Sequence, residues 1–137
     1  MAERIGLGII GFGIMGERLA RFAAGHDQVQ LVGVWDPAPD AAGRLAAAVP
    51  GVPMLASPEA VIAACDCLYV ASPPAFHLVH AKAAFAAGKA AFLEKPLAVD
   101  PEEARTFVEA AEASGARGAV NFPMASSPAV AQLAAWR

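Results

Sequence analysis

Near its N-terminus the chain carries the glycine-rich stretch Gly11-Phe12-Gly13-Ile14-Met15-Gly16. It follows the apolar run Ile5 to Ile10 and opens an apolar-periodic stretch, so it is predicted to join a strand to a helix. Gly11 would let the chain turn sharply, Gly13 would let a pyrophosphate approach the backbone, and Gly16 would let the helix press against the sheet. Free N–H groups and the helix dipole favour an anion at such a helix start. The turn is therefore a candidate pyrophosphate site.

A second apolar run, Val29 to Trp35, ends at Asp36, which lies 20 residues after Gly16. A dinucleotide-binding fold has at about this distance an acid that accepts hydrogen bonds from the adenosine ribose. The alternative for Asp36 is a turn residue, because Asp-Pro often starts a turn after a strand. The glycines at the right distance favour the ribose interpretation.

The N-terminus admits another interpretation, a short signal peptide made of Arg4 and the apolar stretch Ile5 to Met15. Glu3 argues against it, because it would stand in the region that should be positive. Four glycines also interrupt the apolar stretch, and a patterned helix follows directly. We therefore expect a strand, a turn and a helix here.

The composition indicates one soluble domain. The chain has 137 residues, of which 57% are hydrophobic and 17% charged, as in a sheet covered on both faces. A net charge of −3 favours neither a nucleic acid nor an anionic membrane as partner, and no apolar stretch approaches the roughly 18 residues of a spanning helix. Cys65 and Cys67 are expected to be two buried thiols without a metal, which agrees with a reducing cytoplasm.

Strand-like and helix-like segments alternate along the chain. Asp40, Ser57 and Asp100 are predicted to cap helices that follow them. The predicted strands are 5–10, 29–35, 67–71, 90–93 and 118–121. One predicted helix follows residue 16, and the others are 41–48, 58–64, 75–87, 101–114 and 129–136. This order predicts a doubly wound parallel α/β sheet with helices on both faces, a Rossmann fold.

Ligands of such sheets bind beyond the carboxyl ends of the strands, so the residues that directly follow each strand are candidates for a site. Besides the glycine turn and Asp36, the candidates are Ser72, Pro73, Pro74, Glu94, Lys95 and Asn121. The two prolines would hold the backbone extended along the nucleotide and offer carbonyl groups without competing N–H groups.

These motifs together resemble the N-terminal domain of the Gfo/Idh/MocA family. The resemblance rests on the glycine turn, Asp36, Ala71-Ser72-Pro73-Pro74 with His77, and Glu94-Lys95-Pro96, and it covers residues 3 to 121. It implies a nicotinamide-dependent oxidoreductase that acts on sugars, inositols or related polyols. It also implies that Lys95 lies near the nicotinamide and that the Lys95–Pro96 bond is often cis.

The chemistry suits Lys95 as the catalytic residue. Oxidation of an alcohol by hydride transfer requires the hydroxyl proton to leave, and a desolvated lysine beside a cationic ring can accept and return it. Glu94 is expected to modulate Lys95 or to contact a cofactor ribose, the alternative being a solvated pair in a loop. His77 is assigned to the cofactor site, with a brace of the loop or a capping or core histidine as alternatives. His80 is expected to be structural.

Asp36 also bears on the choice of cofactor. Its carboxylate would repel a 2′-phosphate, and Pro37-Ala38-Pro39 supplies no arginine to receive one, so NAD is favoured over NADP. NADP stays the alternative because Arg44 follows eight residues after Asp36, although we expect it to lie too far along the next helix.

Members of the family continue into an α+β domain. The resemblance implies that this domain would supply most of the substrate contacts and the oligomer interface. We therefore expect a dinucleotide-binding domain at 1–121, the start of a connection at 122–137, and a homo-oligomer at full length. The segment after Asn121 lacks the arginine that many relatives carry. One alternative is a free-standing dinucleotide-binding or sensing module. Another is an offshoot of the family that uses NAD transiently, oxidising and re-reducing a sugar in order to hydrolyse it or to eliminate a group from it.

Overall fold

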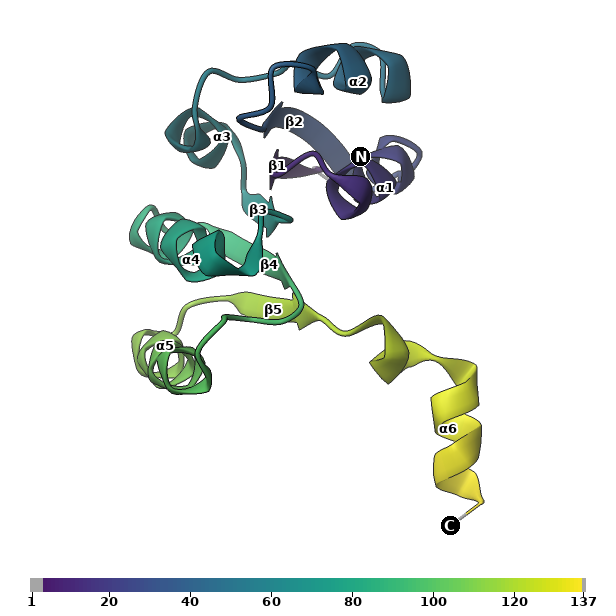
Figure 1. Ribbon diagram of the computed structural model, residues 1–137, viewed down its shortest axis with the longest axis vertical. Coiled ribbons are helices and arrows are strands. Elements are labelled where there is room, and N and C mark those ends of the chain that lie inside the picture. The colour runs from purple at the N-terminus through teal and green to yellow at the C-terminus, as the bar shows by residue number, and fades with distance from the viewer. Residues whose placement is uncertain (1–3, 137) are drawn as a thin grey trace.

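A parallel sheet of five strands forms the centre of the molecule, in the order β2-β1-β3-β4-β5 (Figure 1). The computed structural model describes residues 4–136. Residues 1–3 of the predicted domain 1–121 and residue 137 of the predicted connection 122–137 therefore lie outside the described part. Strand order reverses beside β1, because β2 lies on one side of it and β3 on the other. The strands are β1 (Ile5–Ile10), β2 (Val29–Trp35), β3 (Cys67–Val70), β4 (Ala90–Glu94) and β5 (Gly118–Asn121).

Helices cover both faces of the sheet, which confirms the predicted doubly wound fold. Helices α1 and α2 lie on one face, and α3, α4 and α5 lie on the other (Figure 1). The α-helices are α1 (Ile14–Ala24), α2 (Ala41–Ala48), α3 (Pro58–Ala64), α4 (His77–Ala86), α5 (Pro101–Ser114) and α6 (Pro128–Ala135). Two short 3-10 helices, η1 (Pro74–Phe76) and η2 (Pro123–Ser126), complete the described elements.

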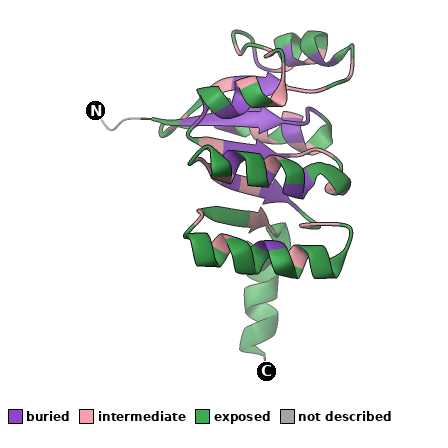
Figure 2. Cartoon of the chain, turned by 90° about the vertical axis from the view of Figure 1, so that its left-hand side faces the viewer, coloured by how far each residue is buried: buried purple, intermediate pink, exposed green. Residues whose placement is uncertain are grey.

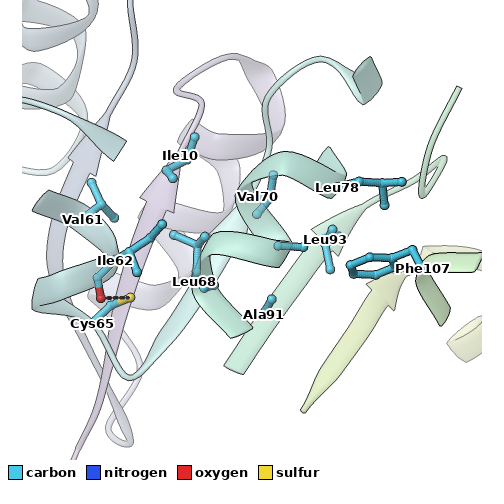
Figure 3. Packing of buried hydrophobic residues seen from close by; sticks show 12 residues of the cluster. Ile10, Val61, Ile62, Cys65, Leu68, Val70, Leu78, Ala91, Leu93 and Phe107 are labelled. Carbon is cyan, nitrogen blue, oxygen red and sulfur yellow. Dashed lines mark hydrogen bonds between the residues drawn. The ribbon is translucent and has the colours of Figure 1, made fainter. Parts of the chain in front are cut away.

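Side chains of the inner strands alternate between two hydrophobic clusters because successive residues of a strand point to opposite faces. Ile9 and Tyr69 pack under α1 and α2, whereas Ile10 and Leu68 pack under α3 and α4. Figure 3 shows the second cluster, in which side chains of β3 and β4 meet those of the covering helices, Phe107 of α5 among them. The inner strands are buried, while the outward faces of the helices are exposed (Figure 2).

Two of the three predicted helix caps are confirmed. The Ser57 hydroxyl accepts a hydrogen bond from the Ala60 N–H at 3.2 Å, and the Asp100 carboxylate accepts one from Glu102 at 2.8 Å. The predicted cap by Asp40 is wrong. Its side chain makes no cap bond, because its carboxylate lies 2.9 Å from the Arg44 guanidinium instead.

The element boundaries depart from the prediction where prolines and strand ends meet. The predicted helix 75–87 divides into η1 and α4, because Pro74 begins a tight 3-10 turn that carries the chain into the helix. Strand β3 ends one residue earlier than predicted and β4 continues one residue further, to Glu94. This extension places Glu94 inside the sheet, where it pairs with Asn121 of β5.

Helix α6 projects away from the sheet and its covering helices (Figures 1 and 2). Its apolar side chains stay uncovered, and Trp136, which follows the helix, is 74% exposed. Within residues 4–136, no helix combines the length and the apolar character that crossing a bilayer would require.

Candidate dinucleotide site

The turn between β1 and α1 owes its shape to two of its three glycines. Gly11 has a φ of 95°, and a Cβ there would lie 2.5 Å from the backbone carbon of Ala71. A Cβ on Gly16 would lie 1.9 Å from the carbonyl oxygen of Gly11. The close approach expected of Gly16 is therefore present, although its nearest neighbour is the turn itself rather than the face of the sheet.

Gly13 is different, because no atom lies within 4 Å of where its Cβ would stand. It is exposed, and its N–H makes no hydrogen bond with any described residue. It also precedes α1 as the N-cap, and no side chain caps this helix. The N–H groups at the start of α1 are thus open to an anionic ligand, and a side chain at position 13 would fill the space in front of them.

Asp36 ties the end of β2 to the glycine turn. Its Oδ2 accepts a hydrogen bond from the Phe12 N–H at 2.6 Å, and its Oδ1 accepts one from the Ala38 N–H at 2.8 Å. Each carboxylate oxygen retains a lone pair, since a carboxylate has about four acceptor positions. Asp36 can therefore hold the turn and still accept bonds from ligand hydroxyls. The Ala38 bond gives Asp36 the turn role, and its ribose role stays a prediction.

A cleft of about 720 Å³ lies at the carboxyl ends of β1, β2 and β3. It contains part of the predicted set, and also Trp35, Phe76 and His80, which the sequence analysis did not assign to the site. The residues that line it are Gly11, Gly13, Trp35, Asp36, Pro37, Ala71, Ser72, Pro73, Phe76 and His80. A cleft with one apolar wall and one carboxylate suits a flat ring attached to a ribose.

His80, which is expected to be structural, lines this cleft, and its role stays a prediction. Phe76 and His80 stand four residues apart at the start of α4, and this spacing brings their side chains to one side of the helix. Burial lowers the pKa of His80, and the neighbouring His77 lowers it further. The same spacing, read from the sequence, would have identified the pair.

His77 braces two loops and is 1% exposed. Its Nε2 lies 2.7 Å from the carbonyl oxygen of Ser72, and its Nδ1 lies 2.9 Å from that of Pro96. Both ring nitrogens therefore lie at hydrogen-bonding distance from backbone carbonyl oxygens, which favours the brace alternative, and a direct contact with the cofactor stays a prediction. The Lys95–Pro96 peptide bond, which follows β4, is cis.

Glu94 lies in a buried network that links the ends of three strands. Its Oε1 accepts hydrogen bonds from the Tyr69 hydroxyl at 2.5 Å and from the Asn121 amide at 2.6 Å. Its Oε2 accepts one from the Lys95 N–H at 3.3 Å. Burial raises the pKa of Tyr69, and its hydrogen bond to Glu94 adds to the shift. Glu94 is only 5% exposed, so the solvated-loop alternative is wrong for Glu94, whereas Lys95 is exposed.

Tyr69 is the member of this network that the sequence analysis missed. A tyrosine inside an apolar strand is a signal, because a buried hydroxyl needs a partner. The Asn121 side-chain amide donates to Glu94, so this network uses one of the two N–H donors of that amide.

The Lys95 side chain is exposed and makes no hydrogen bond or ion pair with any described residue. It directly follows the Glu94 network, and the ammonium group is available to a ligand or substrate. Ser72, half-buried, has a hydroxyl oxygen shielded from solvent that has no partner among the described residues. Within residues 4–136, no group of three or more His, Cys, Asp or Glu side chains is placed to hold a metal ion.

Arg44 reaches the glycine turn from α2, and the expectation that it lies too far along its helix to receive a 2′-phosphate stays a prediction. Its Nη1 donates a hydrogen bond to the carbonyl oxygen of Phe12, 32 residues earlier in the chain. The guanidinium carbon also lies 5.7 Å from the centroid of the Phe12 ring. Because α2 runs beside the turn, a long side chain in its first half spans the gap.

Comparison with known proteins agrees with this geometry. The family model GFO_IDH_MocA, described as an oxidoreductase family with an NAD-binding Rossmann fold, matches residues 5–122. Inositol 2-dehydrogenase of Cereibacter sphaeroides is 42% identical over 116 residues, which cover 81% of this chain and 34% of that protein. The 2,7-anhydro-N-acetylneuraminate hydratase of Escherichia coli is 31% identical over 113 residues, which cover 81% of this chain and 30% of that protein.

Solved structures of similar fold include UDP-N-acetylglucosamine 3-dehydrogenase from Acidithiobacillus ferrooxidans. It has a TM-score of 0.82 and 28% sequence identity, and the match covers 96% of this chain and 43% of that one. The chain thus spans about a third of the length of the curated relatives it matches.

Proposed function

Because the chain belongs to the Gfo/Idh/MocA oxidoreductase family, we propose that it is the NAD-holding part of a dehydrogenase that acts on an inositol or a related polyol. The observation that carries the proposal is the open N-terminus of α1, with Gly13 uncrowded and exposed in front of it. A pyrophosphate at this helix start would place an adenosine in the cleft beside Asp36.

The residues around the site fit this cofactor from end to end. Asp36 would accept the ribose hydroxyls, Ser72 and Pro73 would border the middle of the dinucleotide, and Lys95 would stand beside the nicotinamide. The unpartnered Ser72 hydroxyl gives this middle section a donor that no described residue uses. Phe12, Ile14, Met15 and Pro74 belong to the proposed site through their backbone or as its border, and His77 belongs to it as a brace.

NAD is the proposed cofactor, with NADP as the alternative. Both oxygens of Asp36 are held by backbone N–H groups, so the carboxylate cannot turn away from the ribose. The 2′-phosphate of NADP would bring a second negative charge close to the Asp36 carboxylate, and the two like charges would repel each other. Arg44 is already engaged with Phe12 and Asp40, which leaves less of its charge for a phosphate.

Lys95 is the proposed catalytic residue. NAD, when bound, supplies the hydride acceptor. The Lys95 amine would accept the proton of the substrate hydroxyl and return it in the reverse direction. Glu94 would hold the Lys95 backbone through its Oε2, and Tyr69 and Asn121 would fix that carboxylate from the other side.

The substrate, the second domain and the assembly are also proposals. An inositol or polyol agrees with the 42% identical relative, named an inositol 2-dehydrogenase. The hydratase among the relatives keeps transient oxidation followed by reduction as the alternative reaction, and a dinucleotide-binding module without its own catalysis as a third. We propose domain bounds of 1–121 and 122–137, a cytoplasmic location and a homo-oligomer at full length.

A chimera tests the catalytic proposal. Residues 1–121 would be joined to the remaining part of the Cereibacter sphaeroides inositol 2-dehydrogenase, and NADH formation with myo-inositol followed by absorbance. We expect turnover with NAD⁺ and its loss in the Lys95→Met chimera. Calorimetry on the chain itself supplies the control, because Lys95→Met should change the affinity for NAD⁺ but leave that for ADP-ribose, which lacks the nicotinamide, unchanged. Equal effects on both ligands would contradict a nicotinamide-side position for Lys95.

A further inference from the structure

Two successive peptide groups of the glycine turn are each held by one side chain. Asp36 accepts from the N–H of Phe12, which belongs to the Gly11–Phe12 peptide. Arg44 donates to the carbonyl oxygen of Phe12, which belongs to the Phe12–Gly13 peptide. The anchors come from the end of β2 and from α2, and the Phe12 side chain between them is fully buried.

The second of these peptide groups carries the N–H of Gly13. A peptide unit is planar and trans, so its N–H points opposite to its C=O, and a bond that fixes one also fixes the other. Arg44 pulls the Phe12 carbonyl toward α2 and thereby turns the Gly13 N–H to the opposite side. That N–H makes no hydrogen bond with any described residue.

On the side of Gly13, the described contacts hold only the next peptide group, whose carbonyl oxygen accepts a hydrogen bond from the Glu17 N–H at 2.9 Å. Gly13 is exposed, no atom lies within 4 Å of its absent Cβ, and a glycine can rotate into conformations closed to other residues. Without Arg44, the Phe12–Gly13 peptide could therefore flip. A second bond, from the Arg44 Nε to Asp40 at 2.9 Å, keeps the guanidinium in place over the Phe12 ring.

We propose that Arg44 is a positioning residue that fixes the Phe12–Gly13 peptide with its N–H presented to the pyrophosphate of the dinucleotide. The inference rests on the proposed dinucleotide site. It differs from the role that a basic residue after β2 would have as a ligand of a 2′-phosphate. A positioning residue affects every ligand with a pyrophosphate to the same degree, whereas a phosphate ligand affects NADP⁺ alone.

The test compares calorimetric affinities for NAD⁺, NADP⁺ and ADP-ribose in the wild-type chain, Arg44→Met and Arg44→Lys. Arg105→Met is the matched control, because Arg105 also pairs with acids on its own helix but lies on α5, away from the turn. We expect Arg44→Met to weaken all three ligands by about tenfold, the loss of one bond to a charged group, with Arg44→Lys between it and the wild type. The control should bind as the wild type does.

An amide spectrum of the ligand-free proteins supplies a second readout. The Gly13 N–H signal should shift or broaden in Arg44→Met, while the signals of Gly88 and Gly115 stay in place. Loss confined to NADP⁺, or unchanged affinity together with an unchanged Gly13 signal, would overturn the proposal. If the wild-type chain binds none of the three ligands, the dinucleotide site fails, and the Gly13 signal still decides whether Arg44 fixes the peptide.

Discussion

The three glycines of the turn should respond to substitution in two different ways. At Gly16, a Cβ would stand 1.9 Å from the Gly11 carbonyl oxygen, so the turn or α1 must move by more than an ångström. Overpacking of this kind costs about 1–3 kcal/mol, against a gain of up to about 1 kcal/mol that alanine brings to a helix interior. We therefore expect Gly16→Ala to unfold more easily than the wild type.

At Gly13 the same addition meets open space, so the fold should tolerate it. Gly13 is the N-cap of α1 in an extended conformation, and Gly13→Val should cost at most about 1 kcal/mol, the value of losing a favourable cap residue. Its effect on the ligand should be much larger. One hydrogen bond from the backbone to a charged group contributes about 1.5–3 kcal/mol, and blocked approach removes at least one, so affinity should fall by at least roughly tenfold to a hundredfold.

Thermal unfolding and calorimetric titration with NAD⁺ separate the two effects. For a domain of this size, about 1 kcal/mol corresponds to roughly 3–5 °C in Tm. The expected pattern is a lowered Tm for Gly16→Ala, and a nearly unchanged Tm with binding lost for Gly13→Val. If Gly13→Val bound NAD⁺ as the wild type does, the ligand would not reach the turn. If Gly16→Ala were more stable than the wild type, the contact with Gly11 would be wrong.

Two further predictions concern the buried Glu94 network and His80. Tyr69→Phe should lower the free energy of unfolding by about 1.5–3 kcal/mol, because the buried Glu94 carboxylate loses a donor; urea denaturation measures this, and a change below about 0.5 kcal/mol would count against the network. The pKa of His80 is lowered in the folded state, so the unfolded state binds the proton more tightly. Stability should therefore fall as the pH drops through about 6.5 and below, and His80→Gln should flatten that decline; an identical pH profile in the variant would refute the assignment.

The sequence was sufficient to predict the fold because its signals are local. Strands β1, β2 and β5 begin and end where the apolar runs do, and α3 and α5 begin where Ser57 and Asp100 cap them. Proline and glycine interrupt the chain at element ends, since each restricts or frees the backbone in its own way. In a parallel sheet the carboxyl ends of all strands lie at one edge, so the predicted topology also indicated the edge of the sheet where the candidate site lies.

The sequence could not predict which side chains meet across elements. Asp40 looked like a cap, but a long arginine one turn later competes for its carboxylate. The bond from Arg44 to Phe12 could not be foreseen, because separation along the chain says little about separation between α2 and the turn. Tyr69 and Glu94 stand 25 residues apart and meet only because β3 pairs with β4. Such contacts depend on tertiary packing and cannot be predicted from residue types and their spacing along the chain.

A dinucleotide bound along the carboxyl ends of the strands would run from Asp36 past the glycine turn toward Lys95. Backbone amide spectra of the chain during titration with NAD⁺ can locate it residue by residue. We expect saturable shifts at Gly13, Gly16, Asp36 and Ser72. A larger groove of about 790 Å³ between α4 and α5 touches the site only at Pro74, and its residues Val79 and Val99 should stay unaffected. Shifts confined to that groove would mean that NAD⁺ does not bind at the carboxyl ends of the strands.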